Sequence, residues 1–190
     1  MPGDAAIPRA PMPDAVERVL RIGGVSARDL RARLDASGVR LNAYACRLFD
    51  DDRFAPATEA RTVTTVEVCV GGLGLPDGGP IASILACARA RGLATAPLEV
   101  GPHLRLALLD QAEGAIGRAA SRHRAPPGSL TVISDPLDDD PGTPRGFYLR
   151  RVEGALWLRG FVAGPEHVYA PQDRLVFVDA RGRADAEGGG

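Results

Sequence analysis

One stretch of the sequence, residues 97–111, combines acidic, basic and amide side chains with an apolar background: Glu99, His103, Arg105, Asp110 and Gln111. A histidine beside an arginine loses its proton more readily, and a neutral imidazole is a general base near pH 7. An arginine can hold a carboxylate or phosphate through two parallel hydrogen bonds. We therefore predict a catalytic base, His103, whose ring is oriented by Glu99 or Asp110. Arg105 and Gln111 are predicted to bind an anionic substrate beside it.

The leucines of this stretch predict how those groups are displayed. Three leucines at every second position from 104 to 108 give the alternation of a half-buried strand. Side chains two residues apart in a strand share a face, so His103 and Arg105 should point the same way. The alternative is purely structural: Arg105 pairs with a carboxylate such as Glu99 or Glu67, and His103 bonds to a backbone carbonyl.

A second group of binding side chains lies on a predicted β-hairpin. Two alternating stretches, Phe147–Val152 and Ala155–Val162, flank Glu153-Gly154, a favoured two-residue turn. One face is apolar, while the other carries aromatic and guanidinium groups, which are common anchors of protein interfaces. The predicted partner-binding residues are Arg150, Trp157, Arg159 and, next to the hairpin, His167. The alternative is a solvated face on which arginine stacks on an aromatic ring.

The composition excludes several classes of function. The 190 residues include 23 Lys+Arg, and every one of these in the printed sequence is arginine. Schiff-base chemistry, pyridoxal phosphate attachment and the P-loop lysine are therefore excluded, and we predict no cofactor. A net charge of −1 gives no field that attracts nucleic acid or an acidic membrane. The three histidines have no metal-ligand spacing, so we predict no metal site.

The cysteines and the apolar segments predict a location. Cys46, Cys69 and Cys87 form no C-x-x-C pair, and each lies in an apolar pattern typical of a buried, reduced thiol. The longest apolar run, residues 81–88, is too short to cross a bilayer, and residues 1–13 lack a signal-peptide core. We therefore expect a cytoplasmic protein without a membrane partner.

The order of helix and strand signals predicts an α+β fold: N-terminal helices packed on a mainly antiparallel sheet with a C-terminal β-hairpin. The predicted helices are 14–23, 26–38, 42–50 and 80–92, and the predicted strands 63–70, 103–108, 130–134, 147–152, 155–162 and 175–178. Ser26 and Asn42 are predicted to cap the second and third of these helices, and the last strand is expected to close the sheet. We expect a single domain at 14–181 between a disordered tail at 1–13 and a flexible tail at 182–190. The helices around Gly38 also fit a helix-turn-helix, but three aspartates at 50–52 would repel DNA phosphates.

Two parts of the sequence resemble segments of small uncharacterised bacterial proteins: the block at 98–106, and the paired blocks at 146–150 and 156–160. The resemblance spans residues 26–180 and implies a bacterial intracellular protein, with no activity attached. Our first hypothesis is a small cytoplasmic binding or accessory domain that recognises an unidentified protein partner or a small anionic ligand. The alternative is a cofactor-independent hydrolase, lyase or isomerase with a histidine base and an arginine clamp. A homodimer is compatible with both.

Overall fold

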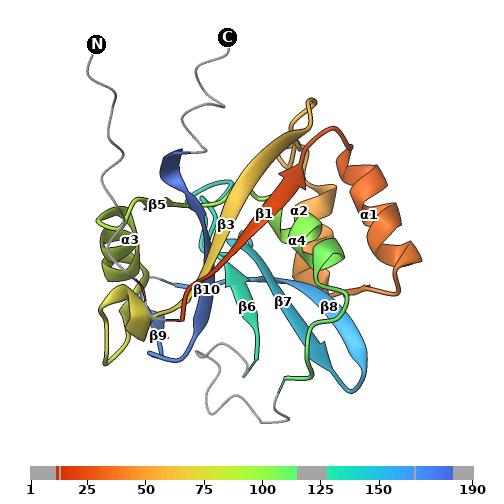
Figure 1. Ribbon diagram of the computed structural model, residues 1–190. Coiled ribbons are helices and arrows are strands. Elements are labelled where there is room, and N and C mark those ends of the chain that lie inside the picture. The colour runs from red at the N-terminus through yellow and green to blue at the C-terminus, as the bar shows by residue number, and fades with distance from the viewer. Residues whose placement is uncertain (1–11, 13, 115–127, 165, 182–190) are drawn as a thin grey trace, which may run out of the picture.

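The computed structural model describes residue 12 and residues 14–114, 128–164 and 166–181, which form an α+β fold (Figure 1). Its α-helices are α1 (Ala27–Ala36), α2 (Ala43–Asp50), α3 (Ile81–Arg89) and α4 (Val100–Ala107), with a 3-10 turn at Gly71–Leu73. Its strands are β1 (Val16–Ile22), β2 (Arg40–Leu41), β3 (Arg61–Cys69), β4 (Gly79–Pro80), β5 (Leu93–Ala94), β6 (Leu130–Val132), β7 (Gly146–Val152), β8 (Ala155–Phe161), β9 (Val168–Tyr169) and β10 (Arg174–Asp179). The predicted fold class is confirmed. Apart from residue 12, the predicted tails lie outside the described residues.

The main sheet has the strand order β1-β3-β10-β6-β7-β8-β2, and β5 also pairs with β10. Neighbouring strands are antiparallel except for β10 with β6 and β2 with β8. The last strand, β10, was expected to close the sheet, but it lies between β3 and β6. Its side chains are buried on both faces of the sheet, as an apolar run such as Leu175 to Val178 requires.

Helices cover both faces of this sheet (Figure 1). On one face α1, α2 and α4 pack over the sheet, and their buried residues join those of β1, β7 and β8 in one core. On the other face α3 packs over β3 and β10, with Ile84 and Ala88 buried against Val66, Val68 and Phe177. The strand ends beside α3 border a cavity that is described below.

The first predicted helix, at 14–23, is a strand. Leu20 and Ile22 are buried on one face of β1, while Val19 and Arg21 are exposed on the other, which is the period of a strand. Asp14 has a φ of 64°, so it does not cap a helix, and β1 pairs with β3 over its whole length. Its valines and isoleucine favour this pairing over a helix.

Two local predictions are confirmed by hydrogen bonds at helix starts. Ser26 caps α1, because its side chain accepts from the N–H of Asp29. Asn42 caps α2 by accepting from the N–H of Ala45 at 3.0 Å. The same amide also accepts from the N–H of Gly160 at 2.8 Å and donates to its carbonyl at 3.0 Å, which fixes α2 to β8.

The helix-turn-helix alternative does not describe this region. α1 and α2 are separated by β2, which pairs with β8 and is part of the sheet. The two helices also lie against the sheet core through Leu34 and Leu48, both buried. The cysteines are free, as predicted, but Cys46, Cys69 and Cys87 are only half-buried.

Residues 100–107 form α4, so the prediction of a strand at 103–108 is wrong. Gly101 allows the helix to approach β7 closely, since a Cβ at this position would lie 2.8 Å from Phe147. Pro102 lies in the first turn of the helix, where a missing N–H leaves no hydrogen bond unmade. The leucines at 104 and 108 are also spaced as neighbours on one face of a helix, so the observed helix accounts for the same apolar residues.

Candidate functional site

Two of the predicted catalytic residues, Glu99 and His103, lie one helical turn apart at the start of α4. Nε2 of His103 is 3.9 Å from Oε2 of Glu99, and the two side chains are only 10% and 4% exposed. In the part of the chain that the structure describes, neither of these atoms has a hydrogen-bond partner. The structure thus brings together the predicted base and the carboxylate predicted to orient it.

Burial shifts both groups toward their neutral forms. It raises the pKa of Glu99, although a backbone hydrogen bond from Ala57 and the charge of Arg61 act in the opposite direction. Nη2 of Arg61 lies 3.7 Å from Oε1 of Glu99. Burial, and then the nearby charge of Arg33, lower the pKa of His103. The imidazole is therefore neutral at pH 7, as a general base requires.

The other predicted substrate-binding groups lie apart from this pair. Residues two apart in an α-helix are separated by about 200°, so the expectation that Arg105 shares a face with His103 is wrong. Arg105 is completely buried and donates to the carbonyl of Leu108 and to Oε1 of Gln111. Burial lowers its pKa to about 10, while the nearby charge of Asp110, which is exposed, opposes this shift. Arg105 and Gln111 thus bond to each other, and Arg105 also bonds to the backbone at the C-terminal end of α4.

The arginine and aromatic side chains predicted on one hairpin face do lie together. The ring of Trp157 has the guanidinium groups of Arg40 and Arg159 at 5.8 and 5.2 Å from its centroid. Arg159 also lies 5.9 Å from the ring of Tyr148, and Arg150 is the cross-strand neighbour of Trp157. These half-buried stacks agree with the structural alternative, and partner binding by this face stays a prediction.

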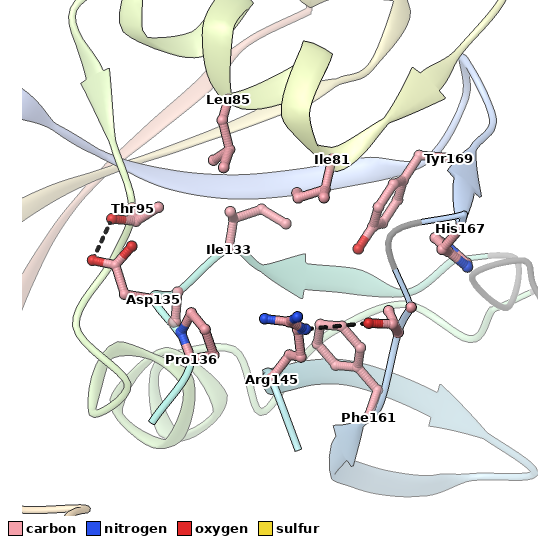
Figure 2. A pocket seen from close by; sticks show the side chains of 13 residues that line it. Ile81, Leu85, Thr95, Ile133, Asp135, Pro136, Arg145, Phe161, His167 and Tyr169 are labelled. Atoms are coloured by element: carbon pink, nitrogen blue, oxygen red, sulfur yellow. Dashed lines mark hydrogen bonds between the residues drawn. The ribbon is translucent and has the colours of Figure 1, made fainter. Parts of the chain in front are cut away.

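His167, the fourth predicted partner-binding residue, lies elsewhere and lines a cavity of about 180 Å³ (Figure 2). The cavity is bordered by α3 and by the segments that adjoin β6, β7, β8 and β9. Its apolar wall includes Ile81, Leu85, Ile133, Pro136 and Phe161. The His167 ring packs edge-on against Tyr169, with 4.4 Å between the ring centroids.

Polar side chains enter this cavity from separate segments. Nε of Arg145 donates to the carbonyl of Ala163 at 3.2 Å, and its terminal nitrogens have no acceptor among the described residues. Figure 2 shows the Arg145 guanidinium and the Tyr169 hydroxyl projecting into the same space. Burial, with the charge of Asp173 adding to it, raises the pKa of Tyr169 to about 12, so this hydroxyl is a neutral donor at pH 7. Oγ of Ser134 is buried without a partner in the described structure.

The carboxylate of Asp135 also borders the cavity, but it lies on the side opposite Tyr169 (Figure 2). Its Oδ2 accepts from Oγ1 of Thr95 at 2.9 Å. The cavity thus has the guanidinium group of Arg145 beside an apolar wall, with this carboxylate on the side away from Tyr169.

The sequence did not point to Arg145, Ser134 or Tyr169 as site residues. Arg145 stands between a proline and a glycine just before β7, Ser134 lies two residues after β6, and Tyr169 ends the two-residue strand β9, so no single sequence pattern groups them. The available signal was the acidic, proline-rich loop at 135–144, because long loops that flank strands often carry binding residues.

In the described part of the chain, no group of three or more His, Cys, Asp or Glu side chains is arranged to hold a metal ion. None of the described helices has the length and apolar character needed to cross a membrane. No protein-family model, curated protein or solved structure matches this chain. Two sites in the described structure have a geometry that could support a function: the Glu99–His103 pair and the cavity around Arg145.

Proposed function

We propose that this protein is a small cytoplasmic binding or accessory protein that takes a small organic anion into the cavity around Arg145. The observation that carries the proposal is an arginine, inside a mostly apolar wall, whose terminal nitrogens have no acceptor among the described residues. Small-molecule sites combine such walls with a few polar groups that fix the orientation of the ligand. Arg145 provides the anion clamp that the sequence suggested for Arg105, whose two terminal nitrogens already donate to Gln111 and Leu108.

The size and lining of the cavity limit the ligand. An apolar cavity of about 150 Å³ is large enough to bind benzene. A cavity of about 180 Å³ therefore has room for one ring or a branched chain of similar size, with a carboxylate against Arg145. The guanidinium offers two parallel hydrogen bonds to that carboxylate, and the Tyr169 hydroxyl offers a third. The apolar part of the ligand packs on Ile133 and Phe161.

Benzoate and benzyl alcohol are suitable probes because they share a ring and differ in charge. Binding of each is measured by isothermal titration calorimetry to the wild type, to Arg145→Met and to a control, Arg28→Met, which removes an exposed arginine on α1. A hydrogen bond to a charged group contributes about 1.5–3 kcal/mol, so Arg145→Met should weaken benzoate roughly 10- to 150-fold. Benzyl alcohol should bind equally well to all three proteins. Equal binding of benzoate to the wild type and Arg145→Met would refute the proposal.

A second candidate, acid–base catalysis by Glu99 and His103, is favoured by the two unpaired atoms that face each other across 3.9 Å. A hollow of about 350 Å³, lined also by Arg53 and Arg61, reaches Glu99 and offers cationic groups to an anionic substrate. A screen for hydrolysis of p-nitrophenyl esters tests this candidate. Catalysis by the pair requires that Glu99→Gln and His103→Gln both abolish any turnover found in the wild type. Turnover that survives in both variants would exclude it.

A further inference from the structure

Among the strands that the structure describes, the first strand, β1, stands at one end of the strand order and pairs with β3 alone, so only one of its two edges is paired (Figure 1). It is seven residues long, which is long enough to present a row of backbone N–H and C=O groups to another strand. The opposite end of the sheet is β2, which has only two residues.

The side chains of β1 divide the strand into an inner and an outer face. Leu20 and Ile22 are buried in the core, and Arg18 on the same side bonds to Glu67 at 2.6 Å. The other face carries Glu17, Val19 and Arg21, all of them exposed. Val19 is 76% exposed, the largest value among the large hydrophobic residues that the structure describes as exposed. An apolar residue thus lies midway between an acid and a base, each two residues away.

We propose that two copies of this chain pair through β1 as antiparallel strands related by a two-fold axis at Val19, which joins their sheets into one. In that register Glu17 of each copy faces Arg21 of the other copy, and the two Val19 side chains face each other. Opposite charges and apolar residues that lie directly across an antiparallel pair stabilise it. The partner is therefore a second copy of this chain, because the sequence of β1 complements itself.

The neighbouring registers lack this complementarity. An axis at Arg18 would place two copies of that arginine opposite each other, and an axis at Leu20 would pair Arg21 with Val19. Only the axis at Val19 forms two pairs of unlike charge. The pKa of Arg181 is raised mainly by its hydrogen bond to Asp179 and to a smaller extent by the charge of Glu17 in the same chain, so the second copy adds a cation to an existing interaction of Glu17.

Exchange of the two charges tests the register. The mass of the full chain is measured by sedimentation velocity and native mass spectrometry over a concentration series. We expect a concentration-dependent dimer that Glu17→Arg and Arg21→Glu each weaken by roughly tenfold or more, because each change replaces two attractive pairs with two repulsive ones. The double exchange, Glu17→Arg with Arg21→Glu, should restore the dimer, and a merely general loss of stability would not be restored in this way.

A second variant tests whether the two-fold axis lies at Val19. Val19→Lys puts two ammonium groups together at the two-fold axis and should weaken the dimer, whereas Val168→Lys, at an exposed valine on β9, should not. Both side chains are exposed, so circular dichroism should show unchanged folding. A wild type that is monomeric at every concentration would overturn the proposal. So would a dimer that tolerates either single charge exchange or that the double exchange fails to restore.

Discussion

The amide of Asn42 joins a helix start to a strand edge, and its removal should be unusually costly for a half-buried side chain. Its Oδ1 accepts from the N–H groups of Ala45 and Gly160, and its Nδ2 donates to the carbonyl of Gly160. Gly160 has no side chain because a Cβ there would lie 2.6 Å from backbone atoms of Tyr44 and Ala45. α2 therefore rests directly on β8, and Asn42→Ala would leave both backbone groups of Gly160 without these bonds.

The expected loss of unfolding free energy follows from the three hydrogen bonds of the Asn42 side chain. Loss of the helix cap costs about 1 kcal/mol, and each backbone group left unpaired at a packed contact costs about 1–1.5 kcal/mol. Asn42→Ala should therefore lower the free energy of unfolding by about 3–4 kcal/mol, which corresponds to a fall in Tm of roughly 10 °C in a domain of this size. Asn42→Asp keeps both accepted bonds and loses only the donor, so its cost should be intermediate.

The matched control is Ser26→Ala, which removes a cap that accepts a single backbone bond on an exposed helix start. That variant should cost about 1 kcal/mol. The free energies of unfolding are measured by urea denaturation, with thermal unfolding followed by circular dichroism as a second readout. The reasoning is refuted if Asn42→Ala costs no more than Ser26→Ala, because the bonds to Gly160 would then contribute nothing.

Three further predictions follow from buried positions. Gly101→Ala should destabilise the protein by about 1–2 kcal/mol in urea denaturation, because the contact with Phe147 outweighs the gain of about 1 kcal/mol in helix propensity. Burial and Arg33 lower the pKa of His103 in the folded state, so the unfolded chain takes up its proton first as the pH falls through 6.5. The stability that neutral His103 permits is therefore fully present above pH 6.5 and decreases below it, and His103→Gln should remove this part of the pH dependence; an unchanged pH profile would contradict the shift. Ultraviolet titration of the phenols should show a step near pH 12 that is absent in Tyr169→Phe, and its persistence in that variant would contradict the burial of the hydroxyl.

Elements that depend on short-range bonds could be predicted from the sequence. The caps at Ser26 and Asn42 were identified because a side-chain oxygen reaches an N–H three residues ahead, whatever the helix packs against. The hairpin was identified from the Glu153-Gly154 pair between two alternating stretches. In the structure both residues adopt positive φ, 50° and 74°, as the predicted two-residue turn requires. The same local reasoning found that Glu99 and His103 are close in the chain, although it placed His103 on a strand.

The element around His103 could not be assigned because its leucines fit two periods. Residues 104, 106 and 108 alternate as in a strand, but 104 and 108 also lie one helical turn apart. The feature that accompanies the helix is the close approach of Gly101 to Phe147, two residues that lie 46 positions apart in the chain. A contact of this kind is not visible in a local pattern. The error reversed the arrangement of the site, since it put Arg105 beside His103 rather than on the opposite side of the helix.

The same reasoning explains why the densest group of polar residues was a poor guide to the cation that is available to a ligand. Where acceptors lie close in the chain, an arginine finds them during folding: Arg53 is held by Asp51, and Arg105 by the carbonyl of Leu108. Arg145 follows a loop that contains four aspartates, but Asp138 of that loop is bonded to Arg53 and Asp135 to Thr95, and the Nε of Arg145 donates to the carbonyl of Ala163 on another segment. Which cation is available to an anion from solution therefore depends on how the fold distributes the acidic side chains, and the spacing of charges in the sequence does not show this.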